Sequence, residues 1–331
     1  MKLFEKIEKN LINLKILPIL EDCGTVLCAL SGGADSVVLL RFLRQYLPAR
    51  GIRLAAAHLN HCIRGAEADA DETFCRSLCD ELEIPFYCRR ADIPALAKNT
   101  GQGLEECARS VRYAFFEEIR SSIADCVIAT AHNATDHLET VLFHLARGTG
   151  ARGLCGISPV RDGYIIRPLL CCTSQEIRAY AAEEGIAYVT DRTNEDTAYT
   201  RNYIRKNMIP AMQKINPRCE EAALRMSASL ADDLTCLESA ASRLLSPEGF
   251  IQRDAVSDAP PALLSRGILA MYRNYTRSAA NLSQVHLSDC MSLIRSGKTG
   301  RISLPGQAVL LAEENCIRIG AQPDILKSAA P

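Results

Sequence analysis

The sequence predicts an α/β fold, in which a doubly wound parallel sheet is followed by a second, mainly helical C-terminal domain. As far as Gly148, short apolar runs alternate with longer amphipathic ones, which is typical of a parallel sheet with right-handed crossovers. From about Ile215 onward the helical pattern dominates, and the chain ends in short strand-like pieces. A chain of 331 residues is too long for one small core, since domains average roughly 150 residues. We therefore expect two domains, over residues 1–215 and 216–331.

Strands and helices are expected to alternate along the first domain. The apolar strand candidates are Thr25–Leu30, Arg53–Leu59, Pro85–Arg90 and Asp125–His132. The helix candidates, which repeat apolar residues at helical spacing, are Asp35–Tyr46, Glu67–Glu83, Leu104–Arg120 and Asp136–Gly148. Beyond them the chain is rich in Gly and Arg, and the pattern indicates a hairpin around Asp162–Gly163 and a helix over Ser174–Glu184.

Composition limits the class of protein. The formal net charge is −1, so the overall charge does not indicate a polyanionic partner. A nearly neutral chain can still carry a local basic stripe on its surface. The fifteen cysteines are scattered and form no C-x-x-C pair, which favours reduced core thiols over a zinc or redox site. The N-terminus lacks the apolar core of a secretory signal, and no apolar run approaches the roughly 20 residues that span a bilayer. These features predict a soluble, cytoplasmic protein.

The stretch SGGADS, residues 31–36, lies where the first predicted strand meets a helix. At such a junction the helix presents free backbone N–H groups and the positive end of its dipole, so an anion fits there. Gly32 and Gly33 let the backbone approach the anion without an intervening Cβ. The hydroxyls of Ser31 and Ser36 add donors. The pattern predicts a phosphate site, although a tight turn with an aspartate cap would explain a bare G-G pair.

Asp35 is unexpected in a phosphate site, because a carboxylate repels phosphate. Its presence is explained if Mg²⁺ bridges the carboxylate and the phosphate oxygens. No G-K-[ST] follows and the glycines do not form G-x-G-x-x-G, so this is neither a Walker A loop nor a dinucleotide fingerprint. We therefore expect a magnesium–phosphate site of another type.

SGGADS resembles the PP-loop of the N-type ATP pyrophosphatases, and further stretches resemble the tRNA(Ile)-lysidine synthetases within that superfamily. These stretches are HLNHCIRGAEADADE (58–72), GLEECARSVRYAFF (103–116), AHNATDHLETVLFHLARGTGARGLCGI (131–157), RPLL, TDRTN and TRNYIR. The resemblance covers about residues 24–210 and is weaker around SGKTGRISLPGQAVLL. It implies that residues 1–215 form a PP-loop ATP-pyrophosphatase domain and that residues 216–331 form a mostly helical domain that contacts tRNA.

The chain departs from this family in two ways. Thr135 stands where the family usually has the first of two aspartates, and His137 stands where Gln or Asn is common. We therefore assign no role to Thr135. Many members also carry a further C-terminal tRNA-contacting domain of roughly another hundred residues, which we expect to be absent or reduced here.

The resemblance implies an ATP-dependent ligase that converts the wobble cytidine, position 34, of the CAU-anticodon isoleucine tRNA into lysidine, which gives AUA decoding. In that reaction the cytosine O2 attacks the α-phosphorus of ATP and releases pyrophosphate. The ε-amine of free lysine then attacks C2 and releases AMP. The implied cofactors are ATP and Mg²⁺, with Asp35 as a catalytic residue and the magnesium ligand. The implied ATP-binding residues are Ser31, Gly32, Gly33, Ala34, Asp35, Ser36 and His58.

Asp136 and Glu139 lie three residues apart at a predicted helix start, so their side chains face the same way. The position is again the carboxyl end of a strand, the side on which open α/β sheets bind ligands. We expect this acidic pair to hold the ammonium group of lysine and to take part in catalysis. A capping box, with the aspartate at N-cap and the glutamate at N3, would explain the same spacing.

Arg109 and Arg112 lie on one face of a predicted helix. They could hold the α-phosphate or the tRNA backbone, and the resemblance implies a catalytic role for Arg112. Surface pairs with Glu105 or Glu106 are the structural alternative.

His58, His61 and His132 fall at or just past predicted strand ends. Imidazoles at this edge of the sheet suit a general base or a polar contact to nucleotide, although a single histidine is more often structural. The resemblance implies that His132 is catalytic.

A basic track for the anticodon stem-loop would draw on arginines from the Gly-rich stretch and beyond it. The expected tRNA contacts are Arg64, Arg109, Arg147, Arg201 and Arg205, and Arg152, Arg161, Arg167 and Lys206 extend the same basic stretches. Ordinary surface charge would explain the same composition. The expected partners are this tRNA and free lysine, with no membrane. A homodimer is compatible with the sequence, which does not determine the oligomeric state.

Two alternative functions remain open. A PP-loop tRNA thiolase would need a persulfide cysteine or an iron–sulfur cluster, usually with the C-x-x-C pairs that this sequence lacks. A non-catalytic nucleotide-sensing module would explain residues 31–36 but not the acidic pair, the arginine helix and the second domain.

Overall fold

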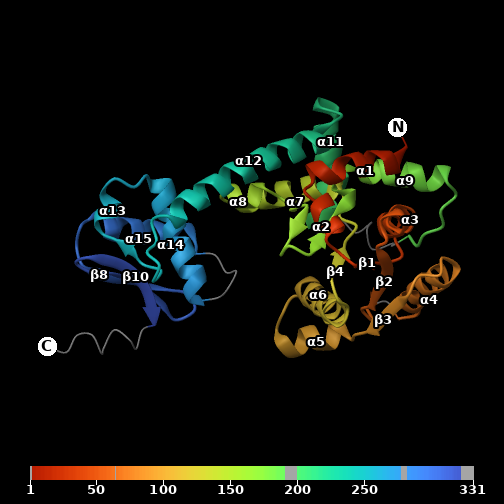
Figure 1. Ribbon diagram of the computed structural model, residues 1–331, viewed down its shortest axis with the longest axis horizontal. Helices are drawn as coiled ribbons and strands as arrows, with labels where there is room; N and C mark the ends of the chain where they lie inside the picture. Colours follow the sequence, from red (N-terminus) through yellow and green to blue (C-terminus); the bar gives the residue numbers. More distant parts are fainter. Residues whose placement is uncertain (1, 64, 191–199, 277–281, 322–331) are drawn as a thin grey trace. The chain divides into compact units, whose positions relative to one another are not determined.

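The computed structural model describes residues 2–63, 65–190, 200–276 and 282–321 (Figure 1). The chain divides into two compact units, Met1–Ala228 and Ser229–Pro331. This division falls inside helix α12 (Cys219–Ser242), later in the chain than the boundary expected near residue 215. The assignment of one domain to ATP and the other to tRNA stays a prediction.

The first unit is built on a six-stranded sheet with the order β3-β2-β1-β4-β6-β5. Its strands are β1 (Thr25–Ala29), β2 (Arg53–Asn60), β3 (Phe86–Arg90), β4 (Cys126–Ala129), β5 (Val160–Arg161) and β6 (Ile165–Ile166). Neighbouring strands are parallel except β5 and β6, which form the expected hairpin around Asp162–Gly163. The predicted doubly wound α/β fold is confirmed.

Helices cover both faces of this sheet because side chains alternate along its strands. On β1, Val26 and Cys28 pack into one core with α1, α3, α4 and α9, while Leu27 packs into the other with Phe115 and Phe116 of α6. The helices of the first face are α1 (Leu3–Asn13), α2 (Leu17–Glu21), α3 (Ala34–Tyr46), α4 (Ala66–Glu81) and α9 (Ser174–Glu183). Those of the second face are α5 (Ile93–Thr100) and α6 (Leu104–Ser122), which lie side by side in Figure 1.

The remaining helices of the first unit follow β4 and are α7 together with segments that pack on it or on one another. They are α7 (Ala134–Arg147), α8 (Ala151–Leu154), α10 (Thr200–Tyr203), a π-helical turn at Ile204–Met208, and α11 (Ile209–Ile215). Two 3₁₀ turns, Pro48–Arg50 and Pro168–Cys171, complete the unit. Leu138 and Leu142 of α7 pack against Ile204 and Ile209, so the segment from α10 to α11 lies on α7.

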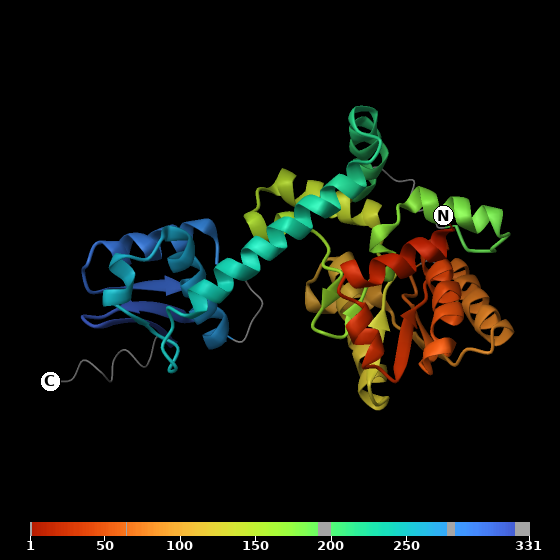
Figure 2. The same cartoon turned by 45° about the horizontal axis from the view of Figure 1, so that its top comes forward.

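The second unit combines helices with a four-stranded antiparallel sheet of order β7-β10-β9-β8 (Figure 2). Its elements are β7 (Ile251–Gln252), α13 (Asp254–Ser257), α14 (Pro261–Thr276), α15 (Gln284–Arg295), β8 (Gly300–Leu304), β9 (Ala308–Ala312) and β10 (Cys316–Ala321). Ile268 of α14 and Cys290 of α15 pack against Leu310 and Ile317 of the sheet. Within the described parts of both units, no helix has the length and apolar character needed to cross a membrane.

Candidate active site

Residues 31–36 leave β1 at the carboxyl edge of the sheet and open α3. Gly32 has φ +88°, and a Cβ there would lie 3.3 Å from Sγ of Cys75, so only glycine fits without strain. Gly33 is the N-cap of α3, and no side chain caps this helix. Helices α7 and α9, by contrast, begin with capping boxes. The first turn of α3 therefore has the uncapped N–H groups that an anion requires.

Ser36 holds the shape of this loop. It is 3% exposed, and its Oγ donates to the carbonyl of Gly33 at 2.9 Å. The same oxygen accepts from N of Ser31 and lies 3.1 Å from Oγ of Ser31, which is exposed. Of the two expected hydroxyl donors, Ser31 therefore faces solvent and Ser36 ties the loop together. Their contacts with ATP stay predictions.

Asp35 carries a buried carboxylate oxygen, Oδ1, which has no hydrogen-bond partner among the described residues. Burial, with a contribution from the nearby charge of Asp136, raises the pKa of Asp35 to about 6. An orphaned carboxylate oxygen beside an uncapped helix start fits a magnesium ion, which uses one or two carboxylates together with substrate phosphates. In the described part of the chain, no three His, Cys, Asp or Glu side chains are grouped to hold a metal by themselves.

Asp136 caps α7 and also faces the predicted ligand side. Asn133 is the N-cap, its Oδ1 accepting from N of Asp136 at 3.0 Å, while Oδ2 of Asp136 accepts from N of Asn133 at 3.1 Å. The capping box is therefore present, but with Asp136 at N3 rather than at N-cap. Its second oxygen, Oδ1, remains available for another partner, and burial raises the pKa of this carboxyl.

That partner is Arg205. Its Nη2 lies 3.2 Å from Oδ1 of Asp136 and 2.7 Å from Oε2 of Glu139, which is only 3% exposed. Burial raises the pKa of Glu139, and the charge of Arg205 opposes this rise. The structure thus brings the predicted acidic pair together. It also places a guanidinium, expected from the sequence to contact tRNA, where the lysine ammonium was expected.

His58 supports the loop from the neighbouring strand β2. The ring is 5% exposed, and its Nδ1 lies 2.9 Å from the carbonyl of Leu30, immediately before the loop. Because Nδ1 must donate to this carbonyl, Nε2 is an acceptor, and it has no partner among the described residues. Burial lowers the pKa of His58 and keeps the ring neutral. The predicted contact with ATP would use this free Nε2.

The other two histidines have different partners. Nε2 of His61 lies 3.0 Å from Nη2 of Arg112, and Nδ1 of His132 lies 3.0 Å from Oγ1 of Thr130. Burial and the charges of four nearby arginines lower the pKa of His132 to about 3. Such an imidazole accepts protons poorly at neutral pH. The geometry therefore favours a polar contact by His132 over the general-base alternative.

The predicted tRNA contacts are spread over several elements. Arg109 is exposed and its guanidinium lies 5.0 Å from the ring centre of Tyr113. Arg147, also exposed, lies over Phe143 at 4.2 Å. Arg201 lies 3.6 Å from a carboxylate oxygen of Glu105. Arg64 lies outside the described residues. Arg201 also lies over Phe143, at 5.8 Å, and shares Glu139 with Arg205, so Arg147, Arg201 and Arg205 are neighbours. The role of these arginines in tRNA binding stays a prediction.

The two departures from the family pattern have structural explanations. Oγ1 of Thr135 accepts from N of Ser174 at 3.1 Å and so joins α7 to α9. His137 is 2% exposed, with Nδ1 accepting from N of Ile157 at 3.2 Å and Nε2 lying 3.0 Å from Oγ of Ser227. Both side chains are used to pack α7 against its neighbours, away from the carboxylates.

Sequence reasoning missed two features of this site. The N-cap Asn133 had a readable signal, an Asn three residues before an Asp at a helix start. The pairing of Arg205 with Glu139 had none, because the two residues are 66 positions apart.

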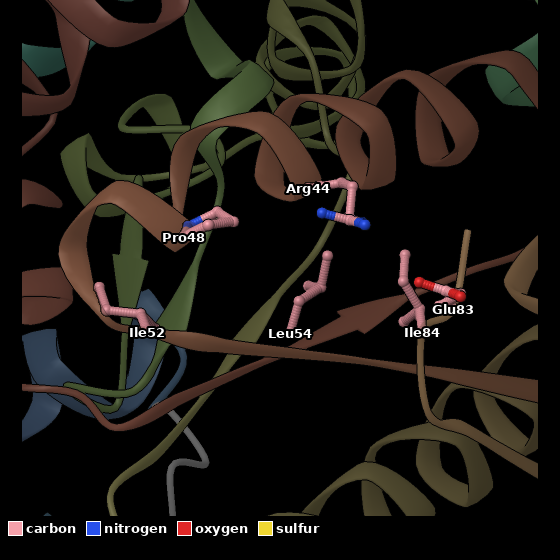
Figure 3. Close-up of a pocket in the computed structure, with 6 residues that line it drawn as sticks. All are labelled: Arg44, Pro48, Ile52, Leu54, Glu83 and Ile84. Carbon is pink, nitrogen blue, oxygen red and sulfur yellow. The ribbon is translucent and has the colours of Figure 1, made fainter.

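A cavity of about 160 Å³ lies elsewhere, at the amino ends of the strands, lined by Arg44, Pro48, Ile52, Leu54, Glu83 and Ile84 (Figure 3). It contains none of the predicted site residues.

Comparison with known proteins agrees with this geometry. The family model described as the PP-loop domain matches residues 4–212. A protein of Bacteroides thetaiotaomicron named tRNA(Ile)-lysidine synthase is 43% identical over 239 residues, which is 71% of this chain and 55% of that protein. A protein of the same name from Clostridium acetobutylicum is 35% identical over 85% of this chain and 62% of its own length. The chain thus spans between about half and two thirds of the length of these relatives.

Among solved structures, a U34-tRNA thiolase of Methanococcus maripaludis with a [4Fe-4S] cluster superposes with a TM-score of 0.58 at 19% identity. The match covers 69% of this chain and 78% of the thiolase. At this identity the similarity is one of fold.

Proposed function

The chain belongs to the PP-loop domain family, and from this premise we propose that it ligates lysine to C2 of the wobble cytidine of the CAU-anticodon isoleucine tRNA. ATP would be converted to AMP and pyrophosphate, and the product would be lysidine. The observation that carries the proposal is the acidic pair, Asp136 and Glu139, at the same sheet edge as Asp35 and the uncapped loop. One edge thus combines the charges needed for a cationic substrate and for a metal-bound phosphate. The names of the relatives support the same reaction.

ATP would bind with its phosphates on the N–H groups that open α3. A magnesium ion held by Asp35 would supply positive charge to those phosphates. Nε2 of His58 would accept a hydrogen bond from the nucleotide, since its Nδ1 is committed to the backbone. The cytosine O2 would then form a bond to the α-phosphorus as the bond to the β-phosphate oxygen breaks, which releases pyrophosphate.

Lysine would enter with its ammonium group beside Asp136 and Glu139. Because burial raises the pKa of both carboxyls, each accepts a proton more readily than an exposed carboxylate does. The neutral ε-amine would attack C2 of the adenylated cytidine, and the C2–O bond would break to release AMP. Arg205 would have to share the carboxylates with the substrate or leave them.

The RNA would lie near Arg109, Arg112 and Arg201, whose side chains are exposed at this edge. The target cytosine lies in an anticodon loop, so little base pairing must be broken to bring it to the site. We propose a cytoplasmic location, where tRNA, ATP and free lysine are all present. The sequence remains compatible with a homodimer.

The thiolase alternative is not favoured. Its chemistry would need cysteines arranged around a cluster or a persulfide, and the sequence has no C-x-x-C pair. The nucleotide-sensing alternative does not explain why a buried carboxylate, Glu139, and a half-buried one, Asp136, lie together at the edge that carries the loop.

The decisive experiment incubates the protein with Mg²⁺, ATP, lysine and a tRNA transcript that carries the CAU anticodon. We expect pyrophosphate release that depends on both lysine and tRNA, and a tRNA whose mass has increased by one lysine residue. Mass spectrometry that finds sulfur at the wobble base would favour the thiolase. Binding of ATP without any pyrophosphate release would favour the sensing module.

A further inference from the structure

Arg167 is a buried cation without an anionic partner. It follows β6 directly and is 4% exposed. Its Nη1 donates to the carbonyl of Ser158, and its side chain also bonds with Tyr113. Its Nε is buried and has no partner in the described part of the chain. No carboxylate lies within ion-pair distance of it among the described residues.

Two nearby arginines, Arg109 and Arg112, likewise have no carboxylate partner among the described residues. Arg109 lies 5.0 Å from the ring centre of Tyr113, the residue to which Arg167 bonds. Arg112 donates to Nε2 of His61 at 3.0 Å. Neither forms an ion pair with any residue that the structure describes.

Arginines elsewhere on the same sheet and on α6 are paired. Arg89 lies 2.6 Å from Glu118, Arg90 lies 2.8 Å from Glu72, and Arg120 lies 2.6 Å from Glu117. The unpaired arginines therefore do not reflect a general shortage of acids. Arg109, Arg112 and Arg167 are instead grouped around His132 at the carboxyl edge of the sheet.

The carboxyl edge of the sheet has an acidic part and a basic part. Asp35, Asp136 and Glu139 make one part acidic, whereas the part around His132 is basic. Burial is the largest cause of the low pKa of His132, and this positive field adds to it, with Arg167 the largest contributor among the charges. A buried cation without a counter-ion is unfavourable, and the cost is recovered when an anion binds.

We propose that Arg167, together with Arg109 and Arg112, forms a second phosphate-binding site at the carboxyl ends of β4 and β6, separate from residues 31–36. The planar guanidinium fork suits phosphate oxygens, and Nε of Arg167 is a donor still to be used. The inference deepens the proposed function, since both the RNA and ATP would bring phosphates to this edge. A phosphodiester of the RNA and a phosphate of ATP are the two sources of the same chemistry.

The test compares Arg167→Gln and Arg167→Lys with wild type. The control is Arg89→Gln, which removes an exposed arginine that is already paired with a carboxylate. Two probes are titrated separately: the CAU anticodon stem-loop RNA without nucleotide, and ATP with Mg²⁺ without RNA. Circular dichroism and thermal unfolding check that each variant is folded. Arg167→Lys keeps the charge and loses the fork, so it reports on the site even if Arg167→Gln does not fold.

We expect Arg167→Gln to weaken binding of one probe at least tenfold, Arg167→Lys to weaken it less, and Arg89→Gln to leave it within twofold. If only binding of the stem-loop RNA is weakened, the site binds an RNA phosphodiester. The slope of log K against log salt concentration should then fall in magnitude by about 0.7 to 1. Loss confined to ATP identifies a nucleotide phosphate. Folded variants that bind both probes as wild type does would overturn the proposal.

This result is independent of catalysis. If the wild-type protein adds no lysine to any tRNA but Arg167→Gln still loses phosphate affinity, the proposed function fails and the second site stands. If wild type makes lysidine and the variants bind both probes normally, the second site fails alone.

Discussion

Nη2 of Arg205 lies 2.7 Å from Oε2 of Glu139, so a guanidinium from the segment after the sheet neutralises a carboxylate that is 3% exposed. The same Nη2 lies 3.2 Å from Oδ1 of Asp136. Since a buried carboxylate without a cation is costly, Arg205 stabilises the acidic pair before any substrate arrives. Arg205 thus orders the pair in the free protein, and a lysine ammonium must compete with Arg205 for the two carboxylates.

The first prediction concerns this ion pair. Arg205→Met should lower the free energy of unfolding at pH 7.5 by about 2 kcal/mol, less than for a fully buried pair because the Arg205 side chain is 34% exposed. The control Arg201→Met should cost much less, since that guanidinium lies 3.8 Å from Glu139. Urea unfolding measures both. Equal losses in the two variants would show that Arg205 has no special role.

The second prediction separates the charge of Asp136 from its capping bond. Asp136→Asn keeps an oxygen for N–H of Asn133, whereas Asp136→Ala removes it and should cost about 1 kcal/mol of stability. Both variants lose the negative charge, so both should raise KM for lysine at least tenfold while the Kd for ATP changes less. Steady-state kinetics and calorimetry give the two quantities. A variant in which lysine and ATP binding fall equally would contradict the lysine-site role.

The third prediction uses the two adjacent glycines. Gly32→Ala should destabilise the fold by about 1 to 2 kcal/mol, because φ is +88° and the new Cβ would crowd Cys75. Gly33→Ala should fold normally, since nothing lies closer to its Cβ position than Oγ of Ser31 at 3.7 Å. It should nevertheless weaken ATP binding at least tenfold, because the Cβ would stand where the phosphate approaches. If Gly33→Ala bound ATP as tightly as wild type, the anion would not lie on this turn.

The fold was predictable because it depends on local patterns. Strand–helix alternation and the G-G turn after an apolar run specify the sheet, the loop and the edge on which the site lies. The expected helix start at Asp35 differs from the observed Ala34 by one position, within the usual fraying of helix ends. The sequence pattern did not predict α5, because its eight residues from Ile93 to Thr100 form too few turns to show a clear helical repeat of apolar residues.

The site was only partly predictable, because its charges interact across the chain. The loop, Asp136 and Glu139 could be proposed from spacing. The contact of Arg205 with Glu139 and the isolation of Arg167 from carboxylates could not, since each depends on which segments pack together in the folded chain. The low pKa of His132 likewise arises from burial and from the charges of four arginines, Arg167, Arg109, Arg112 and Arg201, which come from separate parts of the chain. No local sequence pattern contains these contributions.

The fourth prediction follows from this field. His132, with a pKa of about 3, should stay neutral throughout the pH range from 5 to 9. Its imidazole resonances, followed by NMR with His132→Gln used for assignment, should therefore not titrate in that range. Any activity profile with a limb near pH 6.5 must come from another group. A His132 signal that titrates with an ordinary histidine pKa would show that in solution the ring is not buried beside these arginines.

The fifth prediction concerns Asp35, whose carboxyl has a pKa of about 6 in the folded chain. An unfolded aspartate titrates at about 3.9, so the folded state binds the proton more tightly. The stabilising contribution is therefore complete at low pH and is lost as pH rises from about 4 to about 6. Above that range the metal-free fold carries a buried charge. Asp35→Asn should then be more stable than wild type by about 2 kcal/mol at pH 7.5, and no more stable at pH 4.

The same two proteins are also compared after Mg²⁺ and ATP are added. Millimolar Mg²⁺ with ATP should raise the melting temperature of wild type at pH 7.5, because the ion offsets the buried charge of Asp35. It should raise that of Asp35→Asn much less, and the variant should release little pyrophosphate with lysine and tRNA. The stability gain of the variant and its loss of activity have the same origin, a carboxylate kept charged in a buried place for a cation. An Asp35→Asn protein that is less stable than wild type at pH 7.5, or that responds equally to Mg²⁺ and ATP, would show that the carboxylate is not held for that purpose.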